Sequence, residues 1–207
     1  MDNSKTVTKS VQDSISPAQA VELLKEGNKR FTSGNTLRRS HADQIKDTSG
    51  GQWPYAVVLG CIDSRVPSEI VFDQGIGDIF NVRVAGNFVN VDVLGSIEYA
   101  CKVAGSKAIV VLGHSSCGAV KGACDGVELG NITDMLSKIT PAVEAVSTDG
   151  ERSSSNGSFV QGVVDKNIEL TMENIKNQSP VLKEMIDNGE VELVGGMYDV
   201  STGEVKW

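Results

Sequence analysis

Ala108-Ile109-Val110-Val111-Leu112-Gly113 runs directly into His114-Ser115-Ser116-Cys117-Gly118, and this stretch decides the fold. Its first six residues are a continuous apolar run, which is typical of a strand buried on both faces of a parallel sheet. The same arrangement occurs earlier, where Ala56-Val57-Val58-Leu59-Gly60 precedes Cys61-Ile62-Asp63-Ser64-Arg65. Parallel strands bring their carboxyl ends to one edge of the sheet, so the two polar segments are expected to meet there.

Helices are predicted to alternate with strands along the rest of the chain. The first helix begins at Ser16-Pro17, where a capping residue precedes a proline, and ends at Gly34. Its apolar positions between 20 and 31 form one stripe. The alternation predicts an α/β fold with a mostly parallel central β-sheet flanked by helices. We expect further helices within 91–104, 131–146 and 158–177, further strands at 78–84 and 191–197, a polar loop at 35–53, a flexible arm at 1–15 and a single domain over 16–207.

The composition is that of an ordinary globular domain, with 207 residues, 40% hydrophobic and 22% charged. A net charge of −8 argues against a nucleic-acid partner. No apolar run approaches the length that a membrane span needs. The polar N-terminal segment has no apolar signal core, so we expect a cytoplasmic protein, the alternative being a periplasmic one whose signal peptide was removed.

Two thiols and one imidazole are expected at the shared edge, from Cys61, Cys117 and His114. This set suits zinc, and three protein ligands leave a fourth position for water. A structural zinc site remains an alternative, because a fourth ligand could come from elsewhere in the chain. The candidates for that ligand are Cys124, Cys101 and His41.

Asp63 and Arg65 are two residues apart and face the same side of an extended segment. The plainest interpretation is a surface ion pair. Beside a zinc site, Asp63 could instead coordinate the metal and block it. Paired with Arg65, it could leave the open position to water and orient that water by a hydrogen bond.

The two motifs, C-x-D-x-R and H-x-x-C, and their surroundings resemble the β-class carbonic anhydrases. The similarity extends over roughly residues 17–200 and both motifs are specific to that family. The matching context consists of Ser64-Arg65-Val66-Pro67, Gly77-Asp78-Ile79-Phe80, Ala85-Gly86-Asn87, Ile97-Glu98-Tyr99-Ala100 and the segment from Gly113 to Gly118.

The resemblance implies reversible hydration of CO₂ to bicarbonate and a proton through a zinc-bound hydroxide. It implies one Zn²⁺ per chain, and a homodimer, or a multiple of it, whose N-terminal helix covers the neighbouring subunit. By motif position, Cys61, His114 and Cys117 bind zinc, and Asp63 and Arg65 form a gating dyad. The implied substrate-binding residues are Gly118 through its N–H, Gln52 contributed across the dimer interface, and Phe80, Ala85 and Tyr99 in an apolar CO₂ pocket. For Ala85 and Tyr99, core packing is almost as good an interpretation.

One position departs from the family pattern. Some bacterial members have a second, inhibitory bicarbonate site that needs Trp three residues before the first Cys, and here that residue is Val58.

Two other functions stay open on the sequence alone. One is a non-catalytic zinc protein, and the other is a related hydrolase acting on CS₂ or COS through the same site.

Overall fold

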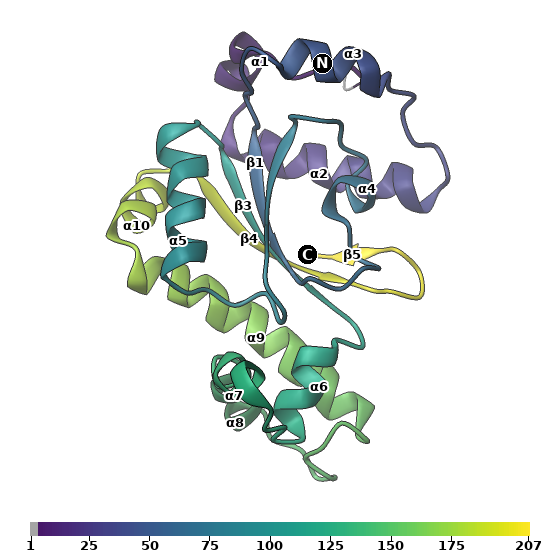
Figure 1. The fold of residues 1–207 in the computed structure, drawn as a ribbon, viewed down its shortest axis with the longest axis vertical. Coiled ribbons are helices and arrows are strands. Elements are labelled where there is room, and N and C mark those ends of the chain that lie inside the picture. Colours follow the sequence, from purple (N-terminus) through teal and green to yellow (C-terminus); the bar gives the residue numbers. More distant parts are fainter. Residues whose placement is uncertain (1–3) are drawn as a thin grey trace.

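The computed structural model describes residues 4–207, and these form a five-stranded sheet with helices on both faces (Figure 1). The strand order is β2-β1-β3-β4-β5. The first four strands of this order are parallel, and β5 pairs antiparallel with β4. The fold class is therefore the predicted one. The strands are β1 (Ala56–Gly60), β2 (Ile79–Arg83), β3 (Ala108–His114), β4 (Glu192–Tyr198) and β5 (Val205–Lys206).

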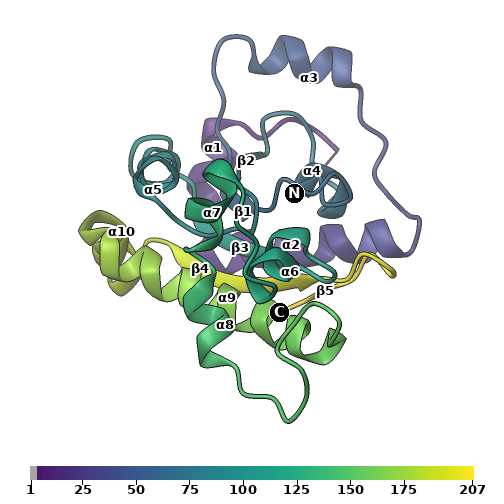
Figure 2. The same ribbon diagram turned by 60° about the horizontal axis from the view of Figure 1, so that its bottom comes forward.

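The helices form two layers, one on each face of the sheet (Figures 1 and 2). Beyond the sheet, α6, α7 and α8 form an extension beside the N-terminal half of α9. None of the helices in the described part of the chain has the length and apolar character needed to cross a membrane. The helices are α1 (Lys9–Ser14), α2 (Pro17–Thr32), α3 (His41–Thr48), α4 (Ser68–Val71), α5 (Val91–Glu98), a π-helical turn (Tyr99–Val103), α6 (Gly118–Cys124), α7 (Gly130–Leu136), α8 (Thr140–Ala145), α9 (Gly157–Gln178) and α10 (Pro180–Asp187).

The two central strands are buried along their whole length. Side chains alternate between the faces of a strand, so each strand contributes to two separate cores. Val57 and Leu59 pack in the core that contains residues of α5, α8, α9 and α10. Ala56 and Val58 pack in the opposite core, with residues of α2 and α4. Helices cover both faces, which explains why these strands read as continuous apolar runs rather than alternating ones.

The N-terminal helix α2 begins where the sequence predicts. Ser16 and Gln19 form a capping box, and Pro17 occupies the first turn. Its apolar stripe, which was expected to cover a neighbouring subunit, is buried in this chain's own core, with Leu24 fully buried. Burial within one chain means that the stripe itself provides no argument for a partner, and the packing of this helix on a neighbouring subunit stays a prediction.

Two short helices lie in segments for which no helix was predicted. Helix α1 lies in the expected flexible arm, and the amide of its buried Gln12 donates to the carbonyl oxygens of Pro54 and Ala104, both at 2.8 Å. Helix α3 lies in the expected 35–53 loop, with Ser40 as its cap. The other predicted elements are present, and the predicted helix at 131–146 is split into α7 and α8 just before Pro141.

Candidate metal centre

Three of the predicted ligands meet at the carboxyl ends of β1 and β3. Cys61 directly follows β1, His114 is the last residue of β3, and Cys117 precedes α6. Their candidate ligand atoms all lie within 4.8 Å of one another, and all three residues are buried. Across residues 4–207 this is the only such group of three or more His, Cys, Asp or Glu side chains.

His114 is fully buried and its ring is oriented by a neighbouring carbonyl group. Nδ1 lies 3.0 Å from the Ser115 carbonyl oxygen, which accepts only if Nδ1 carries the proton. Nε2 is buried and has no hydrogen-bond partner among the described residues. A buried nitrogen without a partner costs stability, whereas a metal ion would use its lone pair. The imidazole therefore fits a metal ligand better than a structural core histidine.

The two thiols behave as a pair that shares one proton. The hydrogen bond from Cys117 lowers the pKa of Cys61 to about 4, and the same interaction, together with burial, raises the pKa of Cys117. The Gly86 N–H also donates to Cys61 Sγ, at 3.4 Å. A divalent cation displaces the remaining proton from such a pair, because only the thiolate is a ligand. The donor set thus fits a tetrahedral zinc ion with one position left open.

Asp63 and Arg65 form a bidentate ion pair beside the cluster. Arg65 Nε donates to Asp63 Oδ1 at 2.9 Å, and Nη2 donates to Oδ2 at 2.8 Å. The Arg65 backbone N–H also donates to Oδ1, at 2.9 Å. These hydrogen bonds hold the pKa of the Asp63 carboxyl well below its usual range. The carboxylate is therefore ionised, and Arg65 fixes its orientation.

Arg83 holds the segment between Cys61 and Asp63 and was not predicted from the sequence. Its Nε donates to the Cys61 carbonyl oxygen at 2.7 Å, and its Nη2 donates to the Asp63 carbonyl oxygen at 2.6 Å. Arg83 is the last residue of β2 and pairs in register with Gly60. A search for polar residues at every strand end, rather than at the two central ones, would have found it.

The predicted substrate-binding residues fall into two groups. Ala85 precedes Gly86, which contacts Cys61, and Gly118 follows Cys117 at the start of α6. Gln52, Phe80 and Tyr99 lie elsewhere: Gln52 is exposed and precedes β1, at the sheet edge opposite the cluster. Phe80 pairs in register with Val57, near the start of β1, and its ring meets that of Tyr99 edge-on, with centroids 6.4 Å apart.

The three candidates for a fourth ligand lie outside the cluster. Cys124 is the last residue of α6, two turns beyond Cys117, and Cys101 lies in the π-helical turn. Burial raises the pKa of both thiols. His41 is exposed at the start of α3. The geometry therefore supplies three protein ligands.

Comparison with known proteins gives one consistent result. The family profile described as "Carbonic anhydrase" matches residues 56–205. "Carbonic anhydrase 2" of Mycobacterium tuberculosis is 39% identical over 193 residues, which is 90% of each chain. The carbonic anhydrase of Mycolicibacterium smegmatis is 36% identical over 196 residues, 92% of each chain. Among solved structures, the β-carbonic anhydrase CcaA superposes with a TM-score of 0.70 at 28% identity, covering 89% of this chain and 86% of that one.

Proposed function

Because the chain belongs to the β class of the carbonic anhydrases, we propose that it hydrates CO₂ reversibly to bicarbonate and a proton, using one zinc ion held by Cys61, His114 and Cys117. The observation that carries this proposal is the buried Nε2 of His114. This nitrogen has no hydrogen-bond partner among the described residues, and the candidate ligand atoms of His114 and the two thiols lie within 4.8 Å of one another. When bound there, zinc supplies a Lewis acid that lowers the pKa of a water molecule toward neutrality.

The chain's own residues orient the reacting water and the substrate. Arg65 holds Asp63 in a bidentate grip, so the carboxylate keeps acceptor capacity for a hydrogen bond from water while being restrained from the ligand position. Gly118, in the first turn of α6, offers a backbone N–H to a substrate oxygen. His41 is exposed and remote in the chain from these groups, so we assign release of the proton to buffer rather than to an internal histidine.

We propose a dimer as the active unit, and the support comes from β2. This strand is the outermost on its side of the sheet, and both polar side-chain atoms of Asn81 are buried there without a partner among the described residues. Close to it, Val91 is 80% exposed and Tyr99 56% exposed, although both are large apolar side chains. A second copy on this face would cover these side chains. It would also bring its own Gln52 toward the metal site of the first copy, since the Gln52 of the first copy lies far from that site.

Stopped-flow CO₂ hydration on metal-analysed protein tests the proposal. We expect one zinc per chain and turnover that disappears when a chelator removes the metal and returns when zinc is added. Zinc binding without CO₂ hydration would favour the non-catalytic zinc protein. Turnover of COS or CS₂ without CO₂ hydration would favour the related hydrolase.

A further inference from the structure

We propose that Asn167, on α9, is a positioning residue for the metal ligand Cys61, acting through the peptide groups of Gly86. The inference rests on the proposed zinc site and goes beyond it, because the hydrogen bond of Asn167 is to Gly86 and not to a metal ligand or to the dyad. Its side-chain amide holds the Gly86 carbonyl group, and the N–H of the same residue donates to the Cys61 sulfur.

The chain of contacts is short and buried. Asn167 Nδ2 donates to the Gly86 carbonyl oxygen at 2.8 Å, across 81 residues of sequence. The Gly86 N–H donates to Cys61 Sγ at 3.4 Å. Asn167 is 3% exposed, so this hydrogen bond is shielded from competing water. Because the Asn167 amide holds the Gly86 carbonyl group, it limits how far the Gly86 N–H can rotate away from the Cys61 sulfur.

The backbone around Gly86 needs such a restraint. Gly86 has φ +83°, and the next residue, Asn87, has φ +43°, a left-handed conformation that asparagine tolerates better than most side chains do. A Cβ on Gly86 would lie 2.4 Å from Cδ1 of Ile139, which is fully buried. Glycine is therefore required at this position. Its conformational freedom makes an external contact the means of holding its peptide groups in one orientation.

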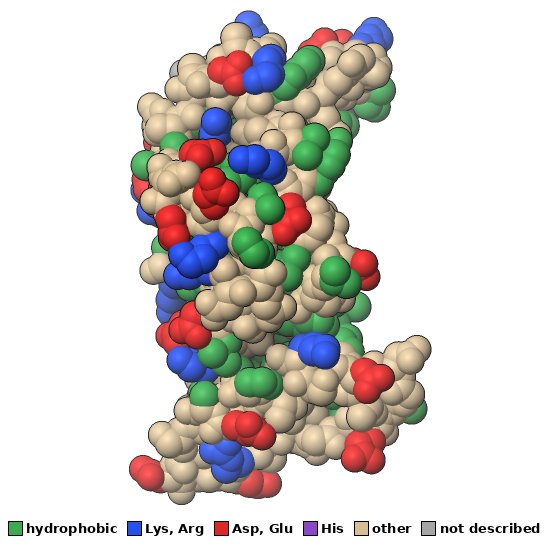
Figure 3. Space-filling view, turned by 90° about the vertical axis from the view of Figure 1, so that its left-hand side faces the viewer, with side chains coloured by type: hydrophobic (Ala, Val, Ile, Leu, Met, Phe, Trp, Pro, Cys, Tyr) green, Lys and Arg blue, Asp and Glu red, His purple; other side chains and the backbone are tan. Residues whose placement is uncertain are grey.

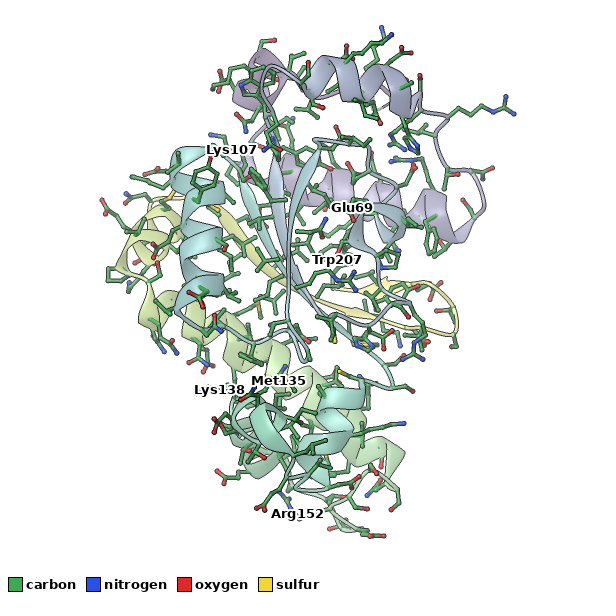
Figure 4. The ribbon with its side chains drawn as sticks, in the orientation of Figure 1. Glu69, Lys107, Met135, Lys138, Arg152 and Trp207 are labelled. Atoms are coloured by element: carbon green, nitrogen blue, oxygen red, sulfur yellow. The ribbon has the colours of Figure 1, made fainter. Side chains whose placement is uncertain are left out.

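Two glycines of the sheet allow helix α9 to pack close to the strands. A Cβ at Gly113 would lie 2.7 Å from Cδ1 of Ile168, and one at Gly195 would lie 2.6 Å from Cγ2 of the same residue. Since neither strand has a side chain there, Ile168 packs directly on β3 and β4. The preceding residue, Asn167, then reaches the 84–87 segment. The same segment lies against Ile139, between α7 and α8. Lys138, the residue before Ile139, is labelled in Figure 4 and lines a groove together with Asn167 and Thr171 of α9.

The expected consequence is on metal affinity and on the electronic state of the sulfur. An N–H hydrogen bond favours the thiolate form and removes charge from the sulfur. If Asn167 lost its donor, the Gly86 peptide groups would be freer to rotate, and the N–H···S contact would weaken. Mutation of a residue that orients a metal ligand in this way typically lowers the metal affinity by about 10- to 100-fold.

The experiment compares Asn167→Asp and Asn167→Leu with the wild type. Both substitutions keep nearly the size of the side chain and remove the amide donor. Thr171→Val, one turn further along α9 at an equally buried position, is the matched control for disturbed helix packing. Zinc affinity is measured by competition with a chromophoric chelator. The second readout is the thiolate-to-metal charge-transfer band of the Co²⁺-substituted protein.

We expect both Asn167 variants to bind zinc about tenfold more weakly and their Co²⁺ band to move to longer wavelength, while Thr171→Val stays at the wild-type values. Unchanged affinity and an unchanged band in a folded Asn167 variant would overturn the proposal. So would an equal change in Thr171→Val. Should both variants fail to fold, amide exchange in the native zinc-loaded protein decides: a slowly exchanging Gly86 N–H supports the contact, and a rapidly exchanging one refutes it. A wild type that binds no zinc would instead defeat the proposed function itself.

Discussion

Oδ2 of Asp63 lies 3.9 Å from Nε2 of His114, close to the ligand cluster but turned toward Arg65. The carboxylate therefore stands beside the atom that would hold the metal without occupying its place. Its position is set by three hydrogen bonds, all donated by Arg65. Of the two arrangements that the sequence left open, the structure has the one in which Asp63 is paired with the guanidinium group.

Removing the guanidinium group should free Asp63 to reach the metal. We expect Arg65→Ala to keep one zinc per chain and to lose about 100-fold in kcat/KM, because a misplaced orienting group costs about that much. Arg65→Lys keeps the charge but not the bidentate geometry, so its kcat/KM should lie between those of the wild type and Arg65→Ala. Metal analysis and stopped-flow rates on the same samples provide the measurement. Wild-type rates in Arg65→Ala would reduce the dyad to a surface ion pair.

Replacing a thiolate ligand should remove the metal itself. We expect Cys61→Ser to bind zinc more than about 100-fold more weakly, beyond the range caused by residues that only orient ligands, because a neutral hydroxyl is a poor substitute for a thiolate. Cys124→Ser is the matched control and should keep full zinc content and activity. Chelator competition measures both. Loss of zinc from Cys124→Ser would instead identify a closed, four-ligand site.

The ligand cluster could be predicted because its signals are local and repeat. Two buried apolar strands each end in chemically distinctive residues, and parallel pairing fixes where strand ends meet. The supporting residues carry no such signal. Asn167 is a polar residue in an amphipathic helix, and its partner is a backbone carbonyl 81 residues earlier. Only the packed fold brings the two together.

The partner of α2 and the presence of α3 could not be read from the sequence for a similar reason. An apolar stripe on α2 shows that one face is buried, but not whether the sheet beneath it belongs to the same chain. Helix α3 has no apolar stripe, and its buried Gln44 is held by a hydrogen bond from the Ile76 N–H at 3.2 Å. Short helices of this kind depend on tertiary contacts rather than on helix propensity, so local sequence does not predict them.

The buried Asp73 should make stability depend on acid. Burial raises the pKa of its carboxyl, but hydrogen bonds from Arg30 and Arg39 outweigh this, and the net pKa is lowered. A carboxyl whose pKa is lower in the folded state stabilises the protein above its unfolded pKa of about 3.9 and loses that effect as pH falls. Asp73→Asn keeps a residue that tolerates the observed φ of +47° and removes the charge that the two arginines face.

We therefore expect Asp73→Asn to lower the free energy of unfolding by about 3 kcal/mol at neutral pH, with the difference shrinking below about pH 4. Urea unfolding of both proteins in the same buffers measures it, so that acid release of metal affects both alike. Asp187→Asn, which removes an exposed ion pair with Lys183, is the control and should change stability by less than about 1 kcal/mol. A difference for Asp73→Asn that grows as the pH falls would contradict the assignment.

The exposed apolar surface beside β2 provides the test of assembly. Figure 3 looks at the side of the molecule that carries α5 and α10, where hydrophobic side chains lie between charged ones. Val91, on α5, lines a groove with Phe80 and Tyr99 and is 80% exposed in the single chain. It is the first residue of its helix, where a carboxylate interacts favourably with the helix dipole, so Val91→Glu should not unfold the protein.

Two such charges buried at a dimer interface should weaken it by about 2–3 kcal/mol, or roughly 30- to 150-fold in dissociation constant. Sedimentation velocity over a concentration series measures this, and CO₂ hydration at the same concentrations shows whether activity follows the dimer. We expect activity to fall as the dimer dissociates, because the proposed dimer supplies each site with the Gln52 of the second copy. Leu129→Glu, at a 64% exposed position between α6 and α7, is the control and should change neither quantity. A fully active Val91→Glu monomer would show that one chain suffices, and an unweakened dimer would place the interface on another face.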